Sequence, residues 1–458
     1  MNKYYVYFVG GVAALAGLLF GVDLGVVAGI QPYLRAEWGL NTHQIEFAIS
    51  SILIGAVVGA ILSGFLNRIF GRKPILAASA LIFVIGSLGS AFVNSYETLI
   101  ILRVFLGLAL GSATFTAPLY ISEVAPKETR GLLISTYQLM ITIGIVIAYM
   151  SDMYFVHLQA SDIITKSETW RWMLGVVAIP SLIMFLIVFA LPRSPRWVMM
   201  KGDKNKALSI LKRLHSDKFA DTEIKEIESS LSHSGNIFER LSDKRFLSVL
   251  SLGIGLQLIQ QFSGMNAILY YAPAMFVSAG FDNVNAMGIT VLIGIVNVIS
   301  TLIALALIDK LGRKKLLYIG GFILLISTVV LSLLFKKNMT ATESIVSILF
   351  IFLFIFGFAI SYGPVIWTLC AEIFPLRGRE LGITFSTASN WIGNTLIASY
   401  SLSIMNSIGT NMFYLLLAAF AVISLLVFKF FVPETKGVSL EHIEQNLWSD
   451  KALNKIGV

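Results

Sequence analysis

Long apolar segments are the feature that most restricts how this chain can fold. Hydrophobic residues make up 56% of the 458 residues and charged residues only 13%, a balance that no soluble core of this length requires. Segments of about 20 apolar residues can cross the roughly 30 Å hydrocarbon layer of a bilayer. We therefore predict an all-α membrane protein with twelve transmembrane helices, near residues 6–30, 47–67, 74–93, 98–119, 131–152, 172–191, 247–276, 285–308, 315–335, 346–370, 379–405 and 412–432.

Short charged motifs divide these segments into two matching halves. Glu123-Val-Ala-Pro-Lys-Glu-Thr-Arg130 corresponds to Glu372-Ile-Phe-Pro-Leu-Arg-Gly-Arg379, and the same number of residues separates the two glutamates and the two arginines. Parallel repeats of six helices are the plan of major facilitator transporters, which bind substrate between the halves near the bilayer midplane. We expect an N-terminal half at residues 1–192 and a C-terminal half at residues 247–432.

The one long polar stretch, residues 193–246, lies between these halves. Its apolar residues suggest short amphipathic helices that lie against the cytoplasmic face. These residues are Leu208, Leu211, Leu214, Ile224, Ile227 and Leu231. We expect a cytoplasmic helical linker rather than a catalytic domain, followed after the second half by a cytoplasmic tail at residues 433–458.

Basic residues indicate the orientation of the chain. Most of the 34 Lys and Arg residues lie in the connections after even-numbered helices and in the tail, whereas the opposite side holds only Arg35, Lys166, Arg171, Lys336 and Lys337. Cytoplasmic loops carry an excess of Lys and Arg, so we expect a multi-pass membrane protein with both termini in the cytoplasm. The net charge of +8 then reflects membrane insertion and does not indicate a nucleic-acid partner.

The chain offers no cluster of residues that would suit catalysis or metal binding. Cys370 is the only cysteine, and the five histidines form no cluster. We therefore expect no disulfide, no metal site, no cofactor and no enzyme activity. Cys370 itself is expected to be a buried apolar residue, because a reactive thiolate needs an electropositive and partly exposed setting.

Two opposite charges lie within the predicted helices, Asp23 in the first and Arg103 at the start of the fourth. A charge inside a bilayer costs at least about 2.5 to 3.5 kcal/mol unless it is paired or hydrated. A carboxylate in a cavity that changes sides can bind a proton when its arginine withdraws and release it when the pair closes. We predict that Asp23 and Arg103 couple a proton to transport; the alternative is a static ion pair that fixes helix packing.

The repeated Glu and Arg residues are expected at the cytoplasmic ends of their helices, where long side chains reach interfacial water. Salt bridges between helices at these ends would hold the cytoplasmic exit closed. The residues expected in this gate are Arg72, Glu123, Arg130, Arg313, Glu372 and Arg379. The alternative is that the basic residues only follow the positive-inside rule, but the matched spacing in the two halves favours a gate.

Amide side chains are unusually frequent in the predicted seventh helix. Near-helical spacing separates Gln257, Gln261 and Gly264, and also Asn266 and Tyr270. This spacing suggests a helix face turned toward a cavity. Amides donate and accept, so they suit a neutral polyol, and aromatic rings cover the apolar face of a sugar. Further candidates for sugar binding are Gln138, Asn297, Trp367, Asn390 and Asn394. The alternative is that these amides bond one helix to another.

Glycine and proline predict where helices are interrupted beside this site. Gly264 in the seventh helix and Gly363-Pro364 in the tenth are expected to weaken helical continuity and to let half-helices bend as gates. Gly264 can equally be a glycine that allows close helix packing.

Longer stretches resemble the sugar porters of the major facilitator superfamily, in particular the bacterial galactose and arabinose proton symporters. They include Gly17-Leu-Leu-Phe-Gly, Thr116-Ala-Pro-Leu-Tyr, Tyr137-Gln-Leu-Met-Ile-Thr-Ile-Gly, Arg171-Trp-Met, Gln260-Gln-Phe-Ser-Gly-Met-Asn, Gly363-Pro-Val-Ile-Trp, Ser386-Thr-Ala-Ser-Asn-Trp-Ile, Pro433-Glu-Thr-Lys and Val438-Ser-Leu-Glu-His-Ile-Glu. The resemblance implies that Asp23 is the proton site and pairs with Arg103, and it adds Gln260 and Gly363 to the sugar contacts. Facilitators of the family usually carry asparagine where this chain has Asp23.

The chain departs from the family pattern at two places in its first half. Arg68 stands where the loop after the second helix usually has an aspartate, and Arg193 stands where an acid commonly precedes Ser-Pro-Arg. The second half keeps Asp309 before Gly312-Arg313, which adds Asp309 to the expected gate. The gate clusters of the two halves are therefore expected to differ in strength.

The sequence predicts a proton-coupled symporter that imports a monosaccharide by alternating access, with D-galactose or D-glucose as the first choice. The proton is the expected coupling ion, and the protein is expected to function in the lipid bilayer as a monomer. The alternatives are a pentose symporter for arabinose or xylose, a facilitative sugar uniporter, and a sugar sensor. Asp23 argues against a facilitator, and the absence of a long signalling tail after Pro433 argues against a sensor.

Overall fold

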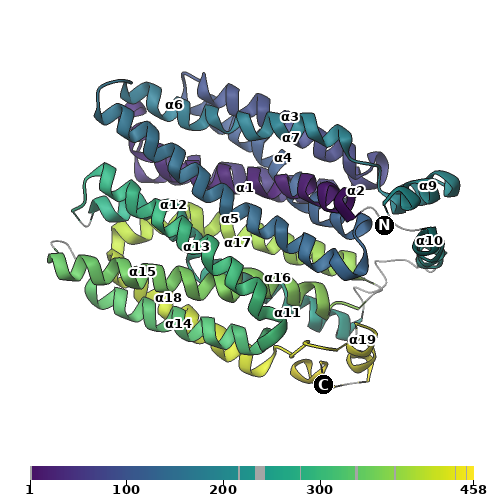
Figure 1. Cartoon of the computed structure of the whole chain (residues 1–458). Coiled ribbons are helices and arrows are strands. Elements are labelled where there is room, and N and C mark those ends of the chain that lie inside the picture. Colours follow the sequence, from purple (N-terminus) through teal and green to yellow (C-terminus); the bar gives the residue numbers. More distant parts are fainter. Residues whose placement is uncertain are drawn as a thin grey trace. The chain divides into compact units, whose positions relative to one another are not determined.

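The computed structural model describes residues 3–214, 217–232, 243–278, 280–335, 339–375, 378–438, 440–449 and 451–457, and every regular element in these ranges is a helix (Figure 1). Up to the linker these are α1 (Lys3–Trp38), α2 (Thr42–Phe70), α3 (Arg72–Ala91), α4 (Tyr96–Val124), α5 (Lys127–Ala160), α6 (Lys166–Val176), α7 (Ala178–Ile187) and a short 3₁₀ helix (Val188–Ala190). The linker contains α8 (Pro195–Met200), α9 (Lys204–Leu214) and α10 (Asp217–Ser232).

The helices after the linker are α11 (Lys244–Phe262), α12 (Met265–Ser278), α13 (Asn283–Leu311), α14 (Arg313–Leu334), α15 (Ala341–Ile360), α16 (Tyr362–Ile373), α17 (Arg379–Ile408) and α18 (Thr410–Phe430). The tail contains α19 (Leu440–Trp448) and a 3₁₀ turn (Leu453–Lys455).

The predicted transmembrane helices are present. Eleven segments of the described residues are long and apolar enough to cross a membrane, and the remaining predicted segment is α17, a helix of 30 residues. The prediction of an all-α protein with twelve transmembrane helices is confirmed. Several helices exceed the predicted windows, since α1 has 36 residues and α5 has 34. An apolar window marks the hydrocarbon layer, whereas a helix can continue beyond it with polar residues.

Three of the predicted helices are interrupted. The sixth is divided between α6 and α7 at Val177, three residues before Pro180, whose missing N–H removes a helical hydrogen bond. The seventh is divided between α11 and α12 at Ser263 and Gly264, where Gly264 has a φ of +89°. This left-handed conformation favours glycine over any residue with a Cβ atom.

The tenth predicted helix is divided between α15 and α16, but not at the expected residues. The break lies at Ser361, whose φ and ψ are −132° and −85°. Gly363 and Pro364 instead belong to the first turn of α16. Proline is well suited to that position, because the first turn of a helix has no intrahelical acceptor for its missing N–H. The expected interruption in this helix is therefore present, and its position is corrected to Ser361.

The chain forms two compact units, and their boundaries fall inside α1, α2, α5 and α6. Unit 1 consists of Met1–Asp23, Ser51–Ala148 and Trp170–Gly235, and unit 2 consists of Leu24–Ser50, Tyr149–Thr169 and Asn236–Val458. Unit 2 therefore contains the second half together with two segments of the first half.

Glycines bring pairs of helices into close contact in unit 1. A Cβ atom on Gly21 of α1 would lie 1.9 Å from the carbonyl oxygen of Ile141 on α5, and one on Gly107 of α4 would lie 2.0 Å from the carbonyl oxygen of Ile52 on α2. Only a residue without a side chain allows such approach, which is the packing mode of small residues in membrane helices. Burial adds to this contact, because α1 is buried along most of its length.

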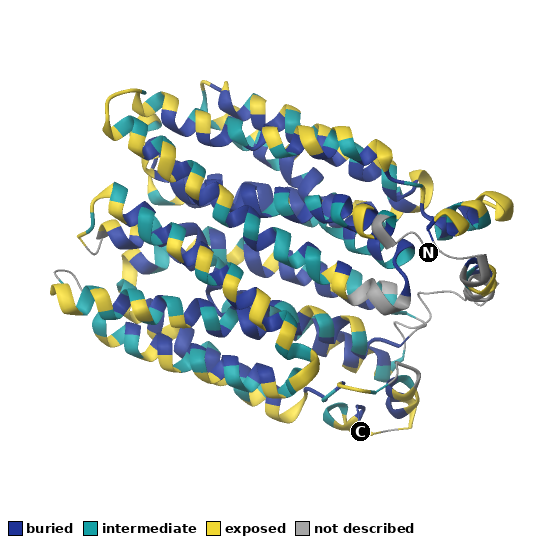
Figure 2. Cartoon of the chain, in the orientation of Figure 1, coloured by how far each residue is buried: buried dark blue, intermediate teal, exposed yellow. Residues whose placement is uncertain are grey.

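In unit 2, α14 packs against both α15 and α18, and α11 packs against α16 and α17 (Figure 1). Large apolar side chains such as Phe322, Leu333 and Ile345 are exposed on α14 and α15, and exposed residues recur along these helices in Figure 2. Exposed apolar surface of this extent is expected where lipid replaces water as the solvent.

The linker helices of unit 1 form a small core of their own. Val198, Leu211, Ile224 and Ile227 are buried together, with Leu208 packed beside them, as the predicted amphipathic pattern requires. The side chain of Leu231 lies outside the described residues.

We expect Gly264→Ala to destabilise the protein, because it forces a Cβ atom into a left-handed conformation and places it 2.5 Å from Cδ1 of Leu417. The expected cost is about 1 to 3 kcal/mol, seen as a lower melting temperature in detergent. Gly255→Ala, on the same helix with open space around the added Cβ, is the matched control and should not lower it. Equal melting temperatures for the two variants would contradict this reading of the break.

Candidate functional site

Buried amides of three helices in unit 2 bond to one another. Nδ2 of Asn390 on α17 donates to Oε1 of Gln257 and to Oε1 of Gln260 on α11, both at 2.7 Å. Nε2 of Gln260 in turn donates to the carbonyl oxygens of Tyr362 at 2.7 Å and Gly363 at 3.1 Å, in the first turn of α16. We call Gln257, Gln260 and Asn390 the amide network. It ties α11 and α17 to the helix break before α16.

A second group of polar side chains lies on α12 and the end of α11. Nδ2 of Asn266 donates to Oε1 of Gln261 at 2.7 Å, and the hydroxyl of Tyr270 donates to Oδ1 of Asn394 on α17 at 3.2 Å. Trp367 on α16 belongs to the same unit and keeps 38% of its surface exposed. These contacts leave Nε2 of Gln261, Oδ1 of Asn266 and Nδ2 of Asn394 without a described protein partner.

Two predicted sugar residues stand apart from these groups. Asn297 is buried on α13, with no hydrogen bond to its side chain among the described residues. Gln138 lies on the part of α5 that belongs to unit 1 and is half-buried. Cys370, predicted as a buried residue, is buried and lies 3.7 Å from Nε2 of Gln257.

Asp23 and Arg103 both lie in unit 1, on α1 and α4, and both are almost fully buried, with 5% and 1% of their surface exposed. The guanidinium of Arg103 interacts electrostatically with the carboxyl of Asp23. In an apolar surrounding an opposite charge compensates part of the cost of burying a carboxylate. Both predicted partners therefore lie in unit 1 and interact electrostatically, and their role in proton coupling stays a prediction.

The repeated charged motifs build matching clusters, one in each unit. In unit 1, Arg72 donates to Glu123, which also accepts a hydrogen bond of 2.6 Å from Ser194. In unit 2, Arg313 donates to Glu372 at 2.8 Å, and Thr435 donates to the same carboxylate at 2.6 Å. We call these the first and second charge clusters. Their members correspond residue by residue between the two halves.

The second charge cluster has two more carboxylates than the first. Asp309 accepts from Arg313 at 3.1 Å, and Glu434 accepts from the backbone N–H groups of Arg313 and Lys314 at 2.9 and 3.0 Å, at the start of α14. A carboxylate at a helix N-terminus satisfies backbone donors and interacts favourably with the helix dipole. Basic residues stand at both equivalent places in the first half, Arg68 and Arg193.

Of the two remaining gate residues, Arg379 and Arg130, the structure describes the side chain of Arg379. Nη2 of Arg379 lies 3.4 Å from the carbonyl oxygen of Phe374. The side chain of Arg130 lies outside the described residues. The alternative that the basic residues only follow the positive-inside rule does not explain why Arg72 and Arg313 each contact the corresponding glutamate.

Sequence reasoning missed a set of contacts in unit 2 between segments of the two halves. Nε2 of Gln31 on α1 donates to the carbonyl oxygen of Tyr270 at 2.6 Å, and the hydroxyl of Tyr149 on α5 donates to the carbonyl oxygen of Leu269 at 2.8 Å. Glu46 on α2, only 1% exposed, accepts from the backbone N–H and the hydroxyl of Ser403 on α17. We call these the interhalf contacts.

Only one signal could have pointed to the interhalf contacts. Glu46 and Asp152 are acidic residues at the edges of apolar segments, where they read as ends of helices. The structure instead buries both of them completely or nearly so, at 1% and 0% exposure.

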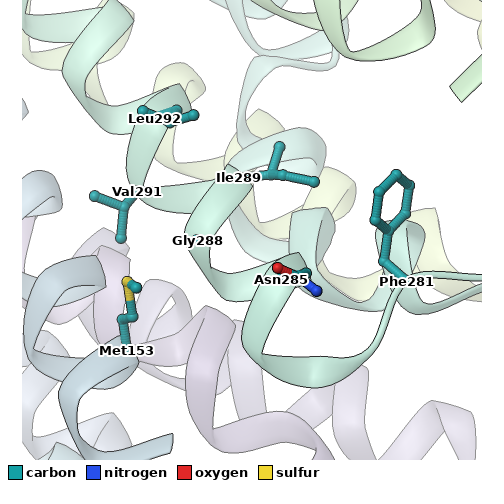
Figure 3. Close-up of a pocket in the computed structure, with 7 residues that line it drawn as sticks. All are labelled: Met153, Phe281, Asn285, Gly288, Ile289, Val291 and Leu292. Carbon is teal, nitrogen blue, oxygen red and sulfur yellow. The ribbon is translucent and has the colours of Figure 1, made fainter. Parts of the chain in front are cut away.

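A cavity of about 530 Å³ lies near the end of α5 and the start of α13. Figure 3 shows Met153 of α5 on one side and Phe281, Asn285 and Ile289 on the other. Asn285 is its only polar lining side chain, and none of the predicted sugar residues lines it. An apolar surface of this kind does not suit a polyol, so we do not assign the sugar site to this cavity.

Comparison with known proteins places this geometry in a family. Residues 9–447 match the family model described as "Sugar (and other) transporter". The chain is 45% identical over 462 residues to the galactose-proton symporter of Escherichia coli K12, covering 100% of this chain and 97% of that protein. It is 41% identical to the arabinose-proton symporter of the same strain, covering 98% and 95%.

Solved structures show the same fold. The xylose transporter XylE of E. coli in a partially occluded, inward-open conformation superposes with a TM-score of 0.83 at 29% identity, over 95% of this chain and 100% of that one. The proton:xylose symporter XylE bound to 6-bromo-6-deoxy-D-glucose gives 0.82 at 30% identity, over 98% and 100%. With the major facilitator fold and a family match along nearly its whole length, the chain belongs to the sugar transporter family.

Proposed function

We propose that the protein is a proton-coupled symporter that imports a monosaccharide, with D-galactose as first substrate and D-glucose as second. The observation that carries the proposal is the buried Asp23, whose carboxyl interacts electrostatically with Arg103, in a chain 45% identical to a galactose-proton symporter over its full length. The same carboxyl is the reason to prefer symport over facilitated diffusion.

Asp23 would bind the proton that drives uptake. An approaching Arg103 guanidinium shifts the Asp23 carboxyl toward its charged form, and when the helices move and Arg103 withdraws, burial shifts it toward the neutral form. One proton moving down 100 mV releases about 2.3 kcal/mol, and each pH unit adds about 1.4 kcal/mol. Coupled one for one, this energy sustains a concentration gradient of a neutral sugar.

The sugar would contact the side chains whose donors and acceptors are not already used. Gln261, Asn266 and Asn394 each keep one polar atom available, and Trp367 offers a partly exposed ring for the apolar face of a pyranose. Gln260 has both amide protons and its oxygen engaged within the protein. We therefore assign Gln260 to positioning α16, beside Gly363. Gln138, Tyr270, Asn297 and Asn390 complete the proposed set.

Alternating access would use the charge clusters and the interhalf contacts at opposite ends of the helices. With both termini in the cytoplasm of a bacterium, the clusters at the starts of α3 and α14 lie on the cytoplasmic side, and the interhalf contacts lie on the outer side. The two halves, residues 1–192 and 247–432, would rock against each other in the inner membrane, joined by the linker 193–246. The gate set is Arg72, Glu123, Arg130, Asp309, Arg313, Glu372 and Arg379, and each monomer would be complete.

A pentose remains the second candidate for the substrate, because arabinose-proton and xylose transporters are also similar over nearly the whole chain. Pentoses and hexoses differ by one hydroxymethyl group. Competition of D-galactose uptake by D-glucose, L-arabinose and D-xylose in the purified protein ranks the four sugars.

We expect Asp23→Asn to abolish uphill transport while sugar exchange persists, because the amide cannot carry the proton. In proteoliposomes with an imposed gradient of one pH unit, the parent protein can accumulate labelled D-galactose about tenfold, whereas the variant only equilibrates it. Glu97→Gln, the same change on an exposed residue, is the control and should accumulate the sugar normally. Protonophore-sensitive accumulation by Asp23→Asn would show that another group carries the coupled proton.

We expect Gln261→Ala and Trp367→Ala to weaken sugar binding. The loss of one hydrogen bond at Gln261 corresponds to about 0.5 to 1.5 kcal/mol, or a rise in Kd of roughly 2- to 12-fold, measured by calorimetry with D-galactose. Gln445→Ala, exposed on α19, controls for effects of the substitution itself. If neither site variant changes the Kd, the sugar site lies elsewhere.

We expect Arg193→Glu to stabilise the first half, because it places a carboxylate where Glu434 accepts the backbone N–H groups of α14. The start of α3 lacks such a cap, since Gly71 offers no side-chain hydrogen bond. The gain should be about 0.5 to 2 kcal/mol, read as a higher melting temperature. The control Arg193→Gln removes the cation without adding a carboxylate. If Arg193→Glu is no more stable than Arg193→Gln, position 193 is not structurally equivalent to Glu434.

A further inference from the structure

A second carboxyl, Asp152, is buried inside the membrane and has no part in the coupling described above. It lies on α5 within the span Leu132–Ala160 and is 0% exposed. The backbone of α1 packs directly on it: a Cβ atom on Gly29 would lie 2.3 Å from Oδ2 of Asp152. Glycine at position 29 therefore makes the space that this carboxyl occupies.

Only the backbone of Gly29 favours a negative charge on Asp152, and burial outweighs that contact. No ion pair among the described residues includes it, and neither of its oxygens has a hydrogen-bond partner there. The backbone of Gly29 interacts with the carboxyl without a well-formed hydrogen bond. A carboxylate buried without a cation and with only this weak backbone contact is unfavourable, so the neutral, protonated form is favoured in this conformation.

Two tyrosines that interact electrostatically with Asp152 direct their hydroxyl groups to other partners. Tyr33 of α1 and Tyr149 of α5 both interact electrostatically with it. The hydroxyl of Tyr33 lies 3.5 Å from Oε1 of Gln159, and that of Tyr149 donates to the carbonyl oxygen of Leu269. From α12, Tyr270 faces Tyr149. These hydroxyls therefore cannot at the same time stabilise a carboxylate at position 152.

The environment of Asp152 depends on the interhalf contacts. Tyr149 is one turn from Asp152 on α5 and bonds to α12, and Gln31 is two residues beyond Gly29 on α1 and also bonds to α12. If α1 and α5 separated from α12, the hydroxyl of Tyr149 would lose its acceptor and water would reach the carboxyl. Both changes favour ionisation.

We propose that Asp152 is a second proton-carrying carboxyl of the transport cycle, which is protonated while the interhalf contacts are formed and releases its proton when they open. The inference rests on the proposed proton-coupled transport and adds a proton-linked step at the interhalf contacts. Low pH then favours the closed interhalf contacts, and high pH favours their opening.

A permanently neutral Asp152 that only fills space is the competing account, and the pH dependence of the interhalf contacts distinguishes the two. Nδ2 of Asn406 donates to Oγ1 of Thr42 at 3.3 Å, beside the Glu46–Ser403 contact. Thr42→Cys and Asn406→Cys carry a pair of spin labels whose dipolar broadening reports the closed population at equilibrium. Cys370, the only cysteine, is replaced by Ala.

The measurement compares Asp152 with Asp152→Asn in the Asp23→Asn background, from about pH 6 to about pH 8. Each proton bound in only one of two states changes their ratio by at most about tenfold per pH unit. We expect the closed population to fall with rising pH when Asp152 is present. In Asp152→Asn we expect the interhalf contacts to remain closed across this range. The part of the pH dependence that Asp152 causes, a change in the closed-to-open ratio of up to about tenfold per pH unit, should be lost. Contributions of His43 and Glu46, 3.4 Å apart near the labels, are common to both proteins.

Asp162→Asn, an exposed acid just after α5, is the matched control and should keep the parent pH profile. Identical profiles for Asp152 and Asp152→Asn overturn the proposal. Because the label signal needs neither sugar nor a proton gradient, it is read even if the protein proves not to be a symporter. If Asp152→Asn does not fold, infrared spectra of Asp23→Asn protein with ¹³C-labelled aspartate are decisive. A buried protonated carboxyl that ionises with rising pH supports the proposal, and one that never does refutes it.

Discussion

A polar group buried in a bilayer has to find its hydrogen-bond partners within the protein, and the amide network of α11, α16 and α17 shows how this chain meets that constraint. Gln260 uses both amide protons on the backbone of α16 and its oxygen on Asn390. The network therefore fixes α16 directly after the break at Ser361, and α16 carries Trp367. The proposed sugar site depends on this arrangement, because its remaining polar atoms project from the helices that the network holds.

The same constraint applies to the charge clusters and to the interhalf contacts, but with different partners. Glu123 and Glu372 are each held by an arginine and a hydroxyl within their own unit. In this conformation each cluster holds together helices of its own half. Gln31 and Tyr149 instead donate to backbone carbonyl groups of α12, which water can replace when segments separate. The interhalf contacts are thus suited to break and reform, while the charge clusters hold their helices together.

Apolar segments and repeated motifs were enough to predict the helices and the matching charge clusters, because both follow from local composition and from fixed spacing. An electrostatic interaction between Asp23 and Arg103 could also be anticipated, since two isolated opposite charges in apolar helices have few other partners. The hydrogen bonds of Gln260 to the backbone of α16 and to Asn390 could not be predicted. An amide gives the same sequence signal whether it binds sugar or backbone. Asp152 and Glu46 were missed for a related reason: an acid at the edge of an apolar segment reads as a helix end, and only the packing of α1 and α17 shows that it is buried. The break at Ser361 was misplaced because proline fits the first turn of the helix that follows a break.

Proton movement driven by sugar tests the central claim most directly. Purified protein is reconstituted into proteoliposomes without any imposed gradient, and D-galactose is added outside while an external pH dye is read. A symporter carries protons inward with the sugar, so the account predicts alkalinisation of the medium that Asp23→Asn eliminates. Entry of labelled D-galactose at an unchanged external pH would contradict it, and would identify the protein as a facilitator.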